Sequence, residues 1–182
     1  AVMGTNNIDN PARLCHAPSM MGLREATGIG AMTNSIAELE NAACILAVGT
    51  NITQSHSVIG LEVKRAVRNG ARLIVVNPRE IDLCRLPNIW LRPYPGTDVA
   101  LLMGISRAIV DEGLLDTTFV EERCQNFEEF RRSLDDFGLG RVERITGVSA
   151  EMIAEAARIY ATNKPGAILW STGVTQHSHG ID

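Results

Sequence analysis

Short apolar runs and longer amphipathic stretches alternate along most of this chain. Four apolar runs have the length of β-strands and cover residues 44–49, 71–77, 88–93 and 166–171. Such runs suit strands that are buried on both faces, and helical stretches separate them, so the pattern predicts βαβ units around a parallel sheet. We therefore expect a doubly wound, mostly parallel α/β sheet flanked by helices, similar to a Rossmann fold.

Capping signals indicate where several helices begin and end. Pro18 suits the first turn of a short helix that Gly28 would end. Ser35 and Glu38 have the spacing of a capping box for a helix through about residue 42, and Ser149 suits the N-cap of a helix through about residue 161. Further helices are expected at residues 99–110, 117–124 and 127–134.

The stretch at residues 57–68 predicts an amphipathic helix, which an Asn-Gly pair at residues 69–70 would end. The polar residues 50–56 before it predict a short loop after the first strand. The apolar face of the helix is expected to contain Val58, Leu61 and Ala66, with Val63 as a fourth candidate.

The composition is that of a globular domain. Of the 182 residues, 45% are hydrophobic and 21% are charged, which is enough for one domain with a substantial core. The net charge of −4, the scattered basic residues and the few aromatics argue against a nucleic-acid surface, and no apolar run has membrane-spanning length. The chain begins with Ala1 and stops soon after a strand signal, so we expect residues 1–182 to be one domain of a larger protein.

The four cysteines lie far apart, and no two of them form a CxxC pair. This spacing argues against a zinc site or a disulfide framework and favours a reducing compartment, so we expect a cytoplasmic protein. Cys44 starts an apolar run and Cys124 lies on an amphipathic stretch, so both are expected in the core. The sequence pattern around Cys84 does not indicate whether this cysteine lies in the core or at the surface.

Polar residues follow each predicted strand. Because ligands of open α/β sheets bind outside the carboxyl ends of the strands, these residues are expected to line one crevice. The alternative is that residues such as Asn51 and Asn77 only make turns and caps, as their residue types often do. The candidates are Gly49, Thr50, Asn51, Asn77, Pro78, Arg79, Gly96, Thr97, Asp98, Thr172, Gly173 and Gln176.

The predicted crevice lacks the signature of a nicotinamide dinucleotide site. The G-x-G at residues 28–30 follows a helix, and the second strand ends in Asn77 instead of an acidic residue. Arg79 could contact a phosphate, and Asp98 could hold a guanine edge or a ribose. These residues suit a large phosphorylated ligand that lies across the strand ends.

Cys15 stands directly before His16 and two residues after Arg13. Both neighbours, and the N-terminal end of the helix near Pro18, would favour the thiolate form of the cysteine. A thiolate beside a histidine permits nucleophilic catalysis with His16 as the base, although adjacent residues orient poorly for it. It also permits one soft ligand to a metal that arrives already chelated, because a single thiolate cannot hold zinc.

Five stretches resemble the catalytic subunit of formate dehydrogenases, which are molybdopterin oxidoreductases, in order and spacing over essentially all 182 residues. They read "TNNIDNPARLCHAPSM", "AVGTNITQSHSVIG", "VVNPRE", "PGTDVALL" and "ILWSTGVTQH", and "ARLCHAP" is the most specific part. The resemblance implies a molybdenum or tungsten bis-molybdopterin guanine dinucleotide. It also implies that Cys15 is the metal ligand and that His16 lies beside the substrate.

The same resemblance assigns cofactor contacts along the chain. Residues 48–55, including Ser55, would surround a phosphate and ribose, and residues 77–80 and 96–98 would make two further contacts. Thr172 and Gln176 would lie near the pterin, and Arg13 is a further candidate because of its charge. Pro11 is not counted among the cofactor contacts, because some relatives contact the cofactor with an asparagine at that position.

In a whole subunit, the resemblance implies the oxidation of formate to carbon dioxide in anaerobic metabolism. Electrons would pass to a [4Fe-4S] cluster in an N-terminal domain and then to electron-transfer subunits. The cysteine motif of that domain and the family's substrate arginine are absent from residues 1–182, so we expect no turnover by this piece alone. The alternatives are another family member, such as a nitrate reductase, and a non-catalytic nucleotide-binding domain.

Overall fold

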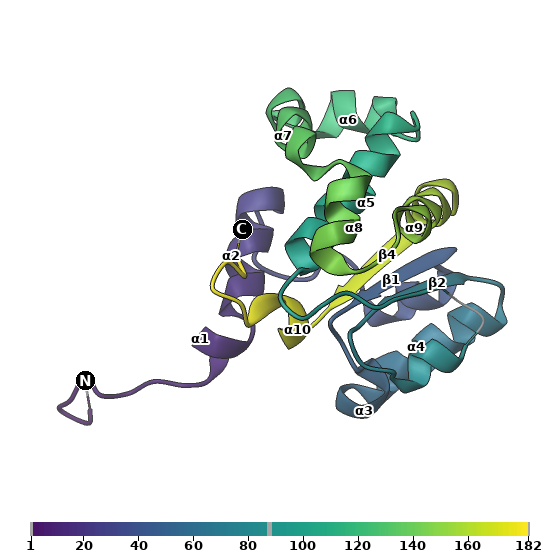
Figure 1. Ribbon diagram of the computed structural model, residues 1–182. Coiled ribbons are helices and arrows are strands. Elements are labelled where there is room, and N and C mark those ends of the chain that lie inside the picture. Colours follow the sequence, from purple (N-terminus) through teal and green to yellow (C-terminus); the bar gives the residue numbers. More distant parts are fainter. Residues whose placement is uncertain (1, 87–88, 182) are drawn as a thin grey trace.

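Four parallel strands form the sheet of the computed structural model, which describes residues 2–86 and 89–181 (Figure 1). The strands are β1 (Cys44–Val48), β2 (Arg72–Val76), β3 (Ile89–Leu91) and β4 (Gly166–Trp170), in the order β3-β2-β1-β4. Cys44 pairs with Arg72 on one side and with Gly166 on the other. The predicted parallel sheet is confirmed, whereas Asn88, expected in the third strand, lies outside the described residues.

The last apolar run forms an edge strand. All five residues of β1 are buried between β2 and β4, but β4 pairs only with β1 among the described strands. Ile168 in β4 is 46% exposed, and the prediction that this strand is buried was wrong. An apolar run predicts a strand, but it does not reveal whether a second strand will pair with its free edge.

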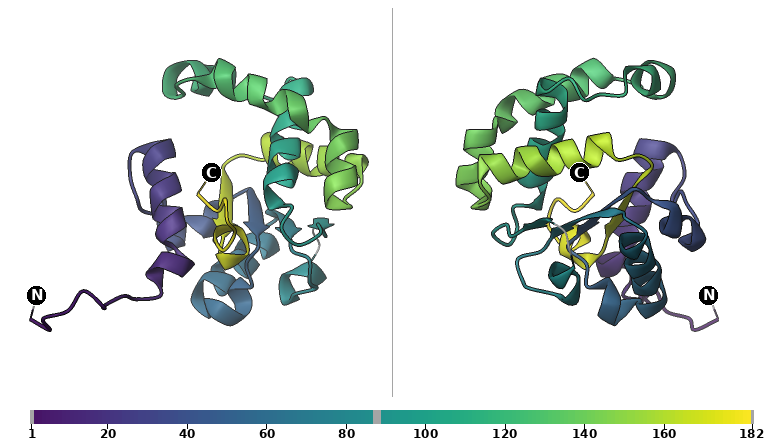
Figure 2. Two further views of the ribbon diagram at one scale, coloured as in Figure 1. Left: turned by 60° about the vertical axis from the view of Figure 1, so that its left-hand side comes forward. Right: turned by 90° about the vertical axis from the view of Figure 1, so that its right-hand side faces the viewer.

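Helices cover both faces of the sheet, as the doubly wound prediction requires (Figures 1 and 2). One face is covered by α4 (Ser57–Arg68), with the 3-10 helix η1 (Ile36–Asn41) beside it. The predicted capping box of Ser35 and Glu38 starts η1. The other face is covered by α5 (Asp98–Asp111), α8 (Leu139–Thr146) and α9 (Ala150–Thr162).

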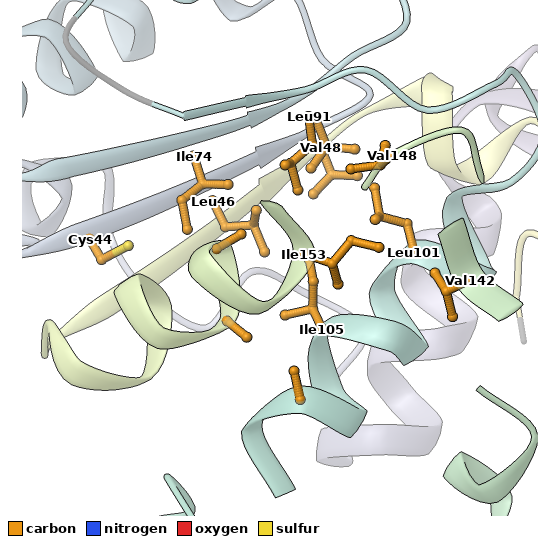
Figure 3. Close-up of a cluster of buried hydrophobic side chains, with 14 residues drawn as sticks. Cys44, Leu46, Val48, Ile74, Leu91, Leu101, Ile105, Val142, Val148 and Ile153 are labelled. Carbon is orange, nitrogen blue, oxygen red and sulfur yellow. The ribbon is translucent and has the colours of Figure 1, made fainter. Parts of the chain in front are cut away.

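The core consists of two layers because successive residues of a strand point to opposite faces. Leu46 and Val48 pack on the α5, α8 and α9 side, in the cluster shown in Figure 3. Ile45 and Ala47 pack on the α4 side. Cys44 is fully buried in the first layer, as predicted.

The buried face of α4 differs from the prediction. Ala66 and Val63 are fully buried, but Val58 and Leu61 are 65% and 54% exposed, so their assignment to the buried face was wrong. The helix instead buries Gly60, whose added Cβ would lie 3.1 Å from the Cα of Thr53. Close packing against the preceding α3 (Ile52–Ser55) thus turns the smaller residues inward. The expected loop at residues 50–56 contains this short helix.

Helices α6 (Thr117–Arg123) and α7 (Phe127–Ser133) and the 3-10 helix η3 (Leu134–Phe137) form an outlying layer, at the top of Figure 1. No residue of α6 is buried, so Cys124, which follows α6, is exposed and its predicted place in the core was wrong. Ser149 caps α9 as predicted, because its Oγ accepts a hydrogen bond from the Met152 amide. Helix α8 was not predicted from the sequence.

The N-terminal part of the chain packs at one side of the sheet, and its first residues extend away from the molecule (Figure 2). It contains α1 (Ala12–Cys15) and α2 (Ala17–Thr27), and α2 ends at Gly28 as predicted, with φ +80°. The remaining elements are η2 (Asp82–Arg85) and α10 (Thr172–Thr175). In the described part of the chain, no helix has both the length and the apolar character needed to cross a membrane.

Candidate functional site

A cavity of about 450 Å³ opens at the carboxyl ends of the strands. The loops after all four strands contribute to its lining, so this cavity is the crevice that the strand ends predict. Of the cofactor contacts named singly, all except Arg13 and Thr97 line it, whereas residues 48, 52–54 and 80 of the predicted ranges do not. The lining predicted from the sequence comprises Gly49, Thr50, Asn51, Ser55, Asn77, Pro78, Arg79, Gly96, Asp98, Thr172, Gly173 and Gln176.

Five further residues line the crevice and were missed. They are Pro93, Tyr94, Pro95, Ser171 and His177. Each lies within three residues of a predicted contact, so a wider window around each strand end would have found them. Tyr94 is held in place because its amide donates to the Thr146 carbonyl at 2.8 Å, a contact across 52 positions that no local pattern shows.

At one wall of the crevice, the backbones of Gly49 and Gly173 approach each other closely, and we call this contact the glycine crossing. Gly49 ends β1 with φ +56°, and its carbonyl accepts a hydrogen bond from the Gly173 amide at 3.1 Å. A Cβ added to Gly173 would lie 2.5 Å from the Gly49 carbonyl oxygen, and one added to Gly49 would lie 2.8 Å from the Gly173 Cα. The close approach therefore requires glycine at both positions, and it joins the ends of β1 and β4.

Asn77, in the lining of the crevice, joins the loops after β1 and β2 to strand β3. Its Oδ1 accepts from the Arg79 amide at 2.9 Å, and its Nδ2 lies 3.5 Å from the Thr50 carbonyl. Its own carbonyl accepts from the Trp90 indole N–H at 2.8 Å. The side chain is 6% exposed and already uses its polar atoms, so the structural interpretation of Asn77 accounts for its position.

Arg79 supplies positive charge to the crevice. Its side chain is exposed at the rim, and among the described residues it has no ion-pair partner. Arg13, in contrast, forms an exposed ion pair of 3.0 Å with Asp9 in the N-terminal segment, and it does not line the crevice. Arg79 is therefore the arginine that is available to a phosphate in this crevice.

Asp98 supplies negative charge at the start of α5. Its carboxylate is largely buried, and burial raises its pKa. A hydrogen bond from its own backbone amide and the charge of His177 act in the opposite direction. Thr97 does not cap α5 as expected, because its hydroxyl donates to the Tyr94 carbonyl at 2.7 Å instead. Asp98, the first residue of α5, is therefore the side chain that remains to interact with the N-terminal end of this helix.

Cys15 and His16 lie where α1 meets α2. Cys15 is partly buried at the end of α1, and its carbonyl accepts a hydrogen bond of 2.6 Å from the hydroxyl of Thr175 in α10. The two short helices lie next to each other in Figure 1. Two other residues of α10 line the crevice, so the same short helix touches both features. His16 Nδ1 lies 3.1 Å from Ser19 Oγ, and the Trp170 indole N–H donates a hydrogen bond to that same oxygen.

The described residues contain no group of three or more His, Cys, Asp or Glu side chains that could hold a metal ion. A metal bound to the Cys15 thiolate would therefore take its remaining ligands from another source. That requirement fits a metal carried by a chelating cofactor.

Comparisons with known proteins complete the description. A family model described as "Molybdopterin oxidoreductase" matches residues 1–182. Formate dehydrogenase H of Escherichia coli (strain K12) is 42% identical over 182 residues, which cover 100% of this chain and 26% of that protein. The F420-dependent formate dehydrogenase 1 subunit alpha of Methanococcus maripaludis is 36% identical over 181 residues, which cover 100% of this chain and 27% of that protein.

Among solved structures, the acetylene hydratase from Pelobacter acetylenicus superimposes with a TM-score of 0.83 at 31% identity. The match covers 95% of this chain and 23% of the hydratase chain. This chain thus spans about a quarter of the length of the curated relatives described above.

Proposed function

This chain belongs to the molybdopterin oxidoreductase family, whose model matches it from end to end, and we propose that it forms part of a formate dehydrogenase catalytic subunit. Two named relatives with this activity cover the whole chain. The observation that carries the proposal is the crevice at the strand ends, which combines a glycine crossing, Arg79 and Asp98, and which shares α10 with Cys15. Residues 1–182 would act as a single nucleotide-binding domain of that subunit.

The residues present fit the guanine dinucleotide end of a molybdopterin cofactor. The crossing of Gly49 and Gly173 keeps side chains away, so a ligand can approach the backbone there. Arg79 would bind a phosphate, and the two oxygens of Asp98 would accept from the donors of a guanine edge. A bis-molybdopterin guanine dinucleotide would supply a second nucleotide, held by other parts of the subunit.

The residues near Cys15 fit a metal and a small anionic substrate. The Cys15 thiolate would be the protein ligand to molybdenum or tungsten, which when bound supplies the two-electron redox chemistry. His16 would lie beside formate, where its ring can steady the anion or hold a proton. Electrons would continue to a [4Fe-4S] cluster in an N-terminal domain and to electron-transfer subunits.

The test uses the full-length protein that contains this chain, purified without oxygen. Formate-dependent dye reduction and metal content are measured for the parent protein, Cys15→Ala and Cys124→Ala. We expect Cys15→Ala to abolish dye reduction, because it removes the protein ligand to the metal. Cys124→Ala is the matched control, since that exposed thiol follows α6, far along the chain from the site, and the variant should keep full activity.

Other outcomes would replace the proposal. Nitrate turnover in place of formate oxidation would indicate a nitrate reductase. Hydration of acetylene without electron transfer would favour the activity named in the similar solved structure. An unaffected Cys15→Ala variant, with no metal in the parent protein, would favour a non-catalytic nucleotide-binding domain.

A further inference from the structure

His177 joins two sides of the crevice. Its Nε2 lies 2.8 Å from the Gly173 carbonyl oxygen and 3.5 Å from Oδ2 of Asp98. Gly173 belongs to α10, which follows β4, whereas Asp98 starts α5, which follows β3, so the contact connects the two edge strands of the described sheet. The ring itself lines the crevice and is about one-third exposed.

The contact with Gly173 determines where the ring carries its proton. The Gly173 carbonyl oxygen can only accept a hydrogen bond, so Nε2 carries a proton and donates it there, and its 3.5 Å contact with the Asp98 carboxylate is an electrostatic one. The Nε2–H form is therefore present in the neutral ring as well as in the charged one. No contact within residues 2–86 and 89–181 occupies Nδ1, so the ring can meet both partners without losing another bond.

We propose that His177 is a positioning residue that holds the Asp98 carboxylate as a double acceptor and so sets the preference of this crevice for guanine over adenine nucleotides. The inference rests on the proposed function only in taking the crevice as a nucleotide site. It concerns a side chain that ends one of the quoted stretches but was given no role there, and it acts through Asp98.

The chemistry of the two bases gives the reason. The pairing edge of guanine presents two neighbouring N–H donors, which an ionised carboxylate can accept with its two oxygens. The pairing edge of adenine presents one donor and one acceptor, which a protonated carboxyl group would match. The carboxylate of Asp98 is 12% exposed, and burial favours its protonated form, whereas the charge of His177 favours the ionised form.

The test measures nucleotide binding to the full-length apoprotein, which is independent of metal loading and of turnover. Calorimetric titration with GDP and with ADP gives the ratio of the two dissociation constants for the parent protein and for His177→Ala. We expect the parent to prefer GDP, and we expect His177→Ala to reduce that preference by about tenfold or more, because removing one partner of a largely buried charge pair leaves the other without compensation. His177→Gln keeps a neutral N–H donor and should restore part of the preference.

Controls separate this role from general damage to the crevice. His56→Ala removes a histidine that contacts Ser55 at the rim but not Asp98, so the ratio should stay at the parent value. An unchanged ratio in His177→Ala, with GDP still preferred by the parent, would overturn the inference and leave the proposed function standing. A parent protein that does not prefer GDP would instead contradict the guanine assignment of the crevice itself.

Discussion

At the scale of single residues, the crevice contains one group that is unfavourable for folding and others that are open to a ligand. Asp98 is largely buried without an arginine or lysine partner among the described residues, and Gly49 has a left-handed backbone. Arg79 is exposed without an ion-pair partner in the same part of the structure. The buried carboxylate of Asp98, which costs stability, is more easily explained by binding than by folding.

Asp98 makes this argument measurable. Its raised pKa means that the folded state binds the carboxyl proton more tightly than the unfolded state does. Its contribution to stability is therefore present below the unfolded-state pKa and is lost as the pH rises through the folded-state pKa. At neutral pH the buried carboxylate should destabilise the protein, so Asp98→Asn should raise the melting temperature at pH 7.

The stabilisation by Asp98→Asn should shrink as the pH falls, because a protonated aspartic acid resembles asparagine in charge and shape. Thermal unfolding of the parent and the variant between pH 4 and pH 7 measures this trend. A difference that is constant over this range, or larger in acid, would contradict the burial argument. Asp116→Asn serves as a reference whose pKa shift has the opposite sign, since a hydrogen bond from Lys164 lowers the pKa of that exposed carboxyl.

At the scale of elements, the sequence predicts strands and helices that depend on a local residue pattern, and it misses features that depend on how neighbouring elements pack. The runs at β1 and β2 predict strands because burial on both faces requires uninterrupted apolar residues. The exposure of Val58 could not be predicted, because it depends on how closely α4 approaches α3. Helix α8 was missed because glycines occupy positions 138 and 140, where its first turn forms.

The glycine crossing yields a prediction about the junction between β1 and α10. Gly49→Ala should destabilise the protein through both its positive φ and a backbone contact at 2.8 Å. Gly113 has a similar φ of +67° but open space around it, so Gly113→Ala should show the strain alone, roughly 1–2 kcal/mol. Gly173→Ala should show the collision without the left-handed strain.

Urea unfolding of the three variants measures these free energies. The loss for Gly49→Ala should clearly exceed the loss for Gly113→Ala, and Gly173→Ala should also be strongly destabilised. Equal losses for Gly49→Ala and Gly113→Ala would show that the crossing relaxes easily. In that case the crossing would not be a rigid wall for a ligand.

At the scale of the whole molecule, the candidate site follows from topology more than from any single motif. Parallel strands bring their carboxyl ends to one edge, so the order of apolar runs and polar loops is enough to group residues 49–51, 77–79 and 172–176. The bond between Thr175 and Cys15 spans 160 positions, and the contact between His177 and Asp98 spans 79. Such contacts exist only after the chain has folded, which is why the sequence could not show them.

The four cysteines report on folding of the whole chain. Cys44 is completely buried in the central strand, and burial raises the pKa of its thiol to about 11, so it should react only when the sheet opens. Cys124 is exposed after α6 and should react first with a thiol reagent. Mass-spectrometric mapping of alkylated cysteines over time, with Cys124→Ser as the control for the fast phase, measures both rates.

The denaturant dependence of the Cys44 reaction decides the interpretation. If β1 opens only with the whole domain, its labelling rate should rise with urea as steeply as global unfolding does, whereas the Cys124 rate should hardly change. Early labelling of Cys44 without denaturant would mean that the edge strand β4 separates from β1 in the native state. Because β4 carries the chain to Gly173 and His177, such opening would also break the crevice, and the nucleotide site proposed here would lack a stable wall.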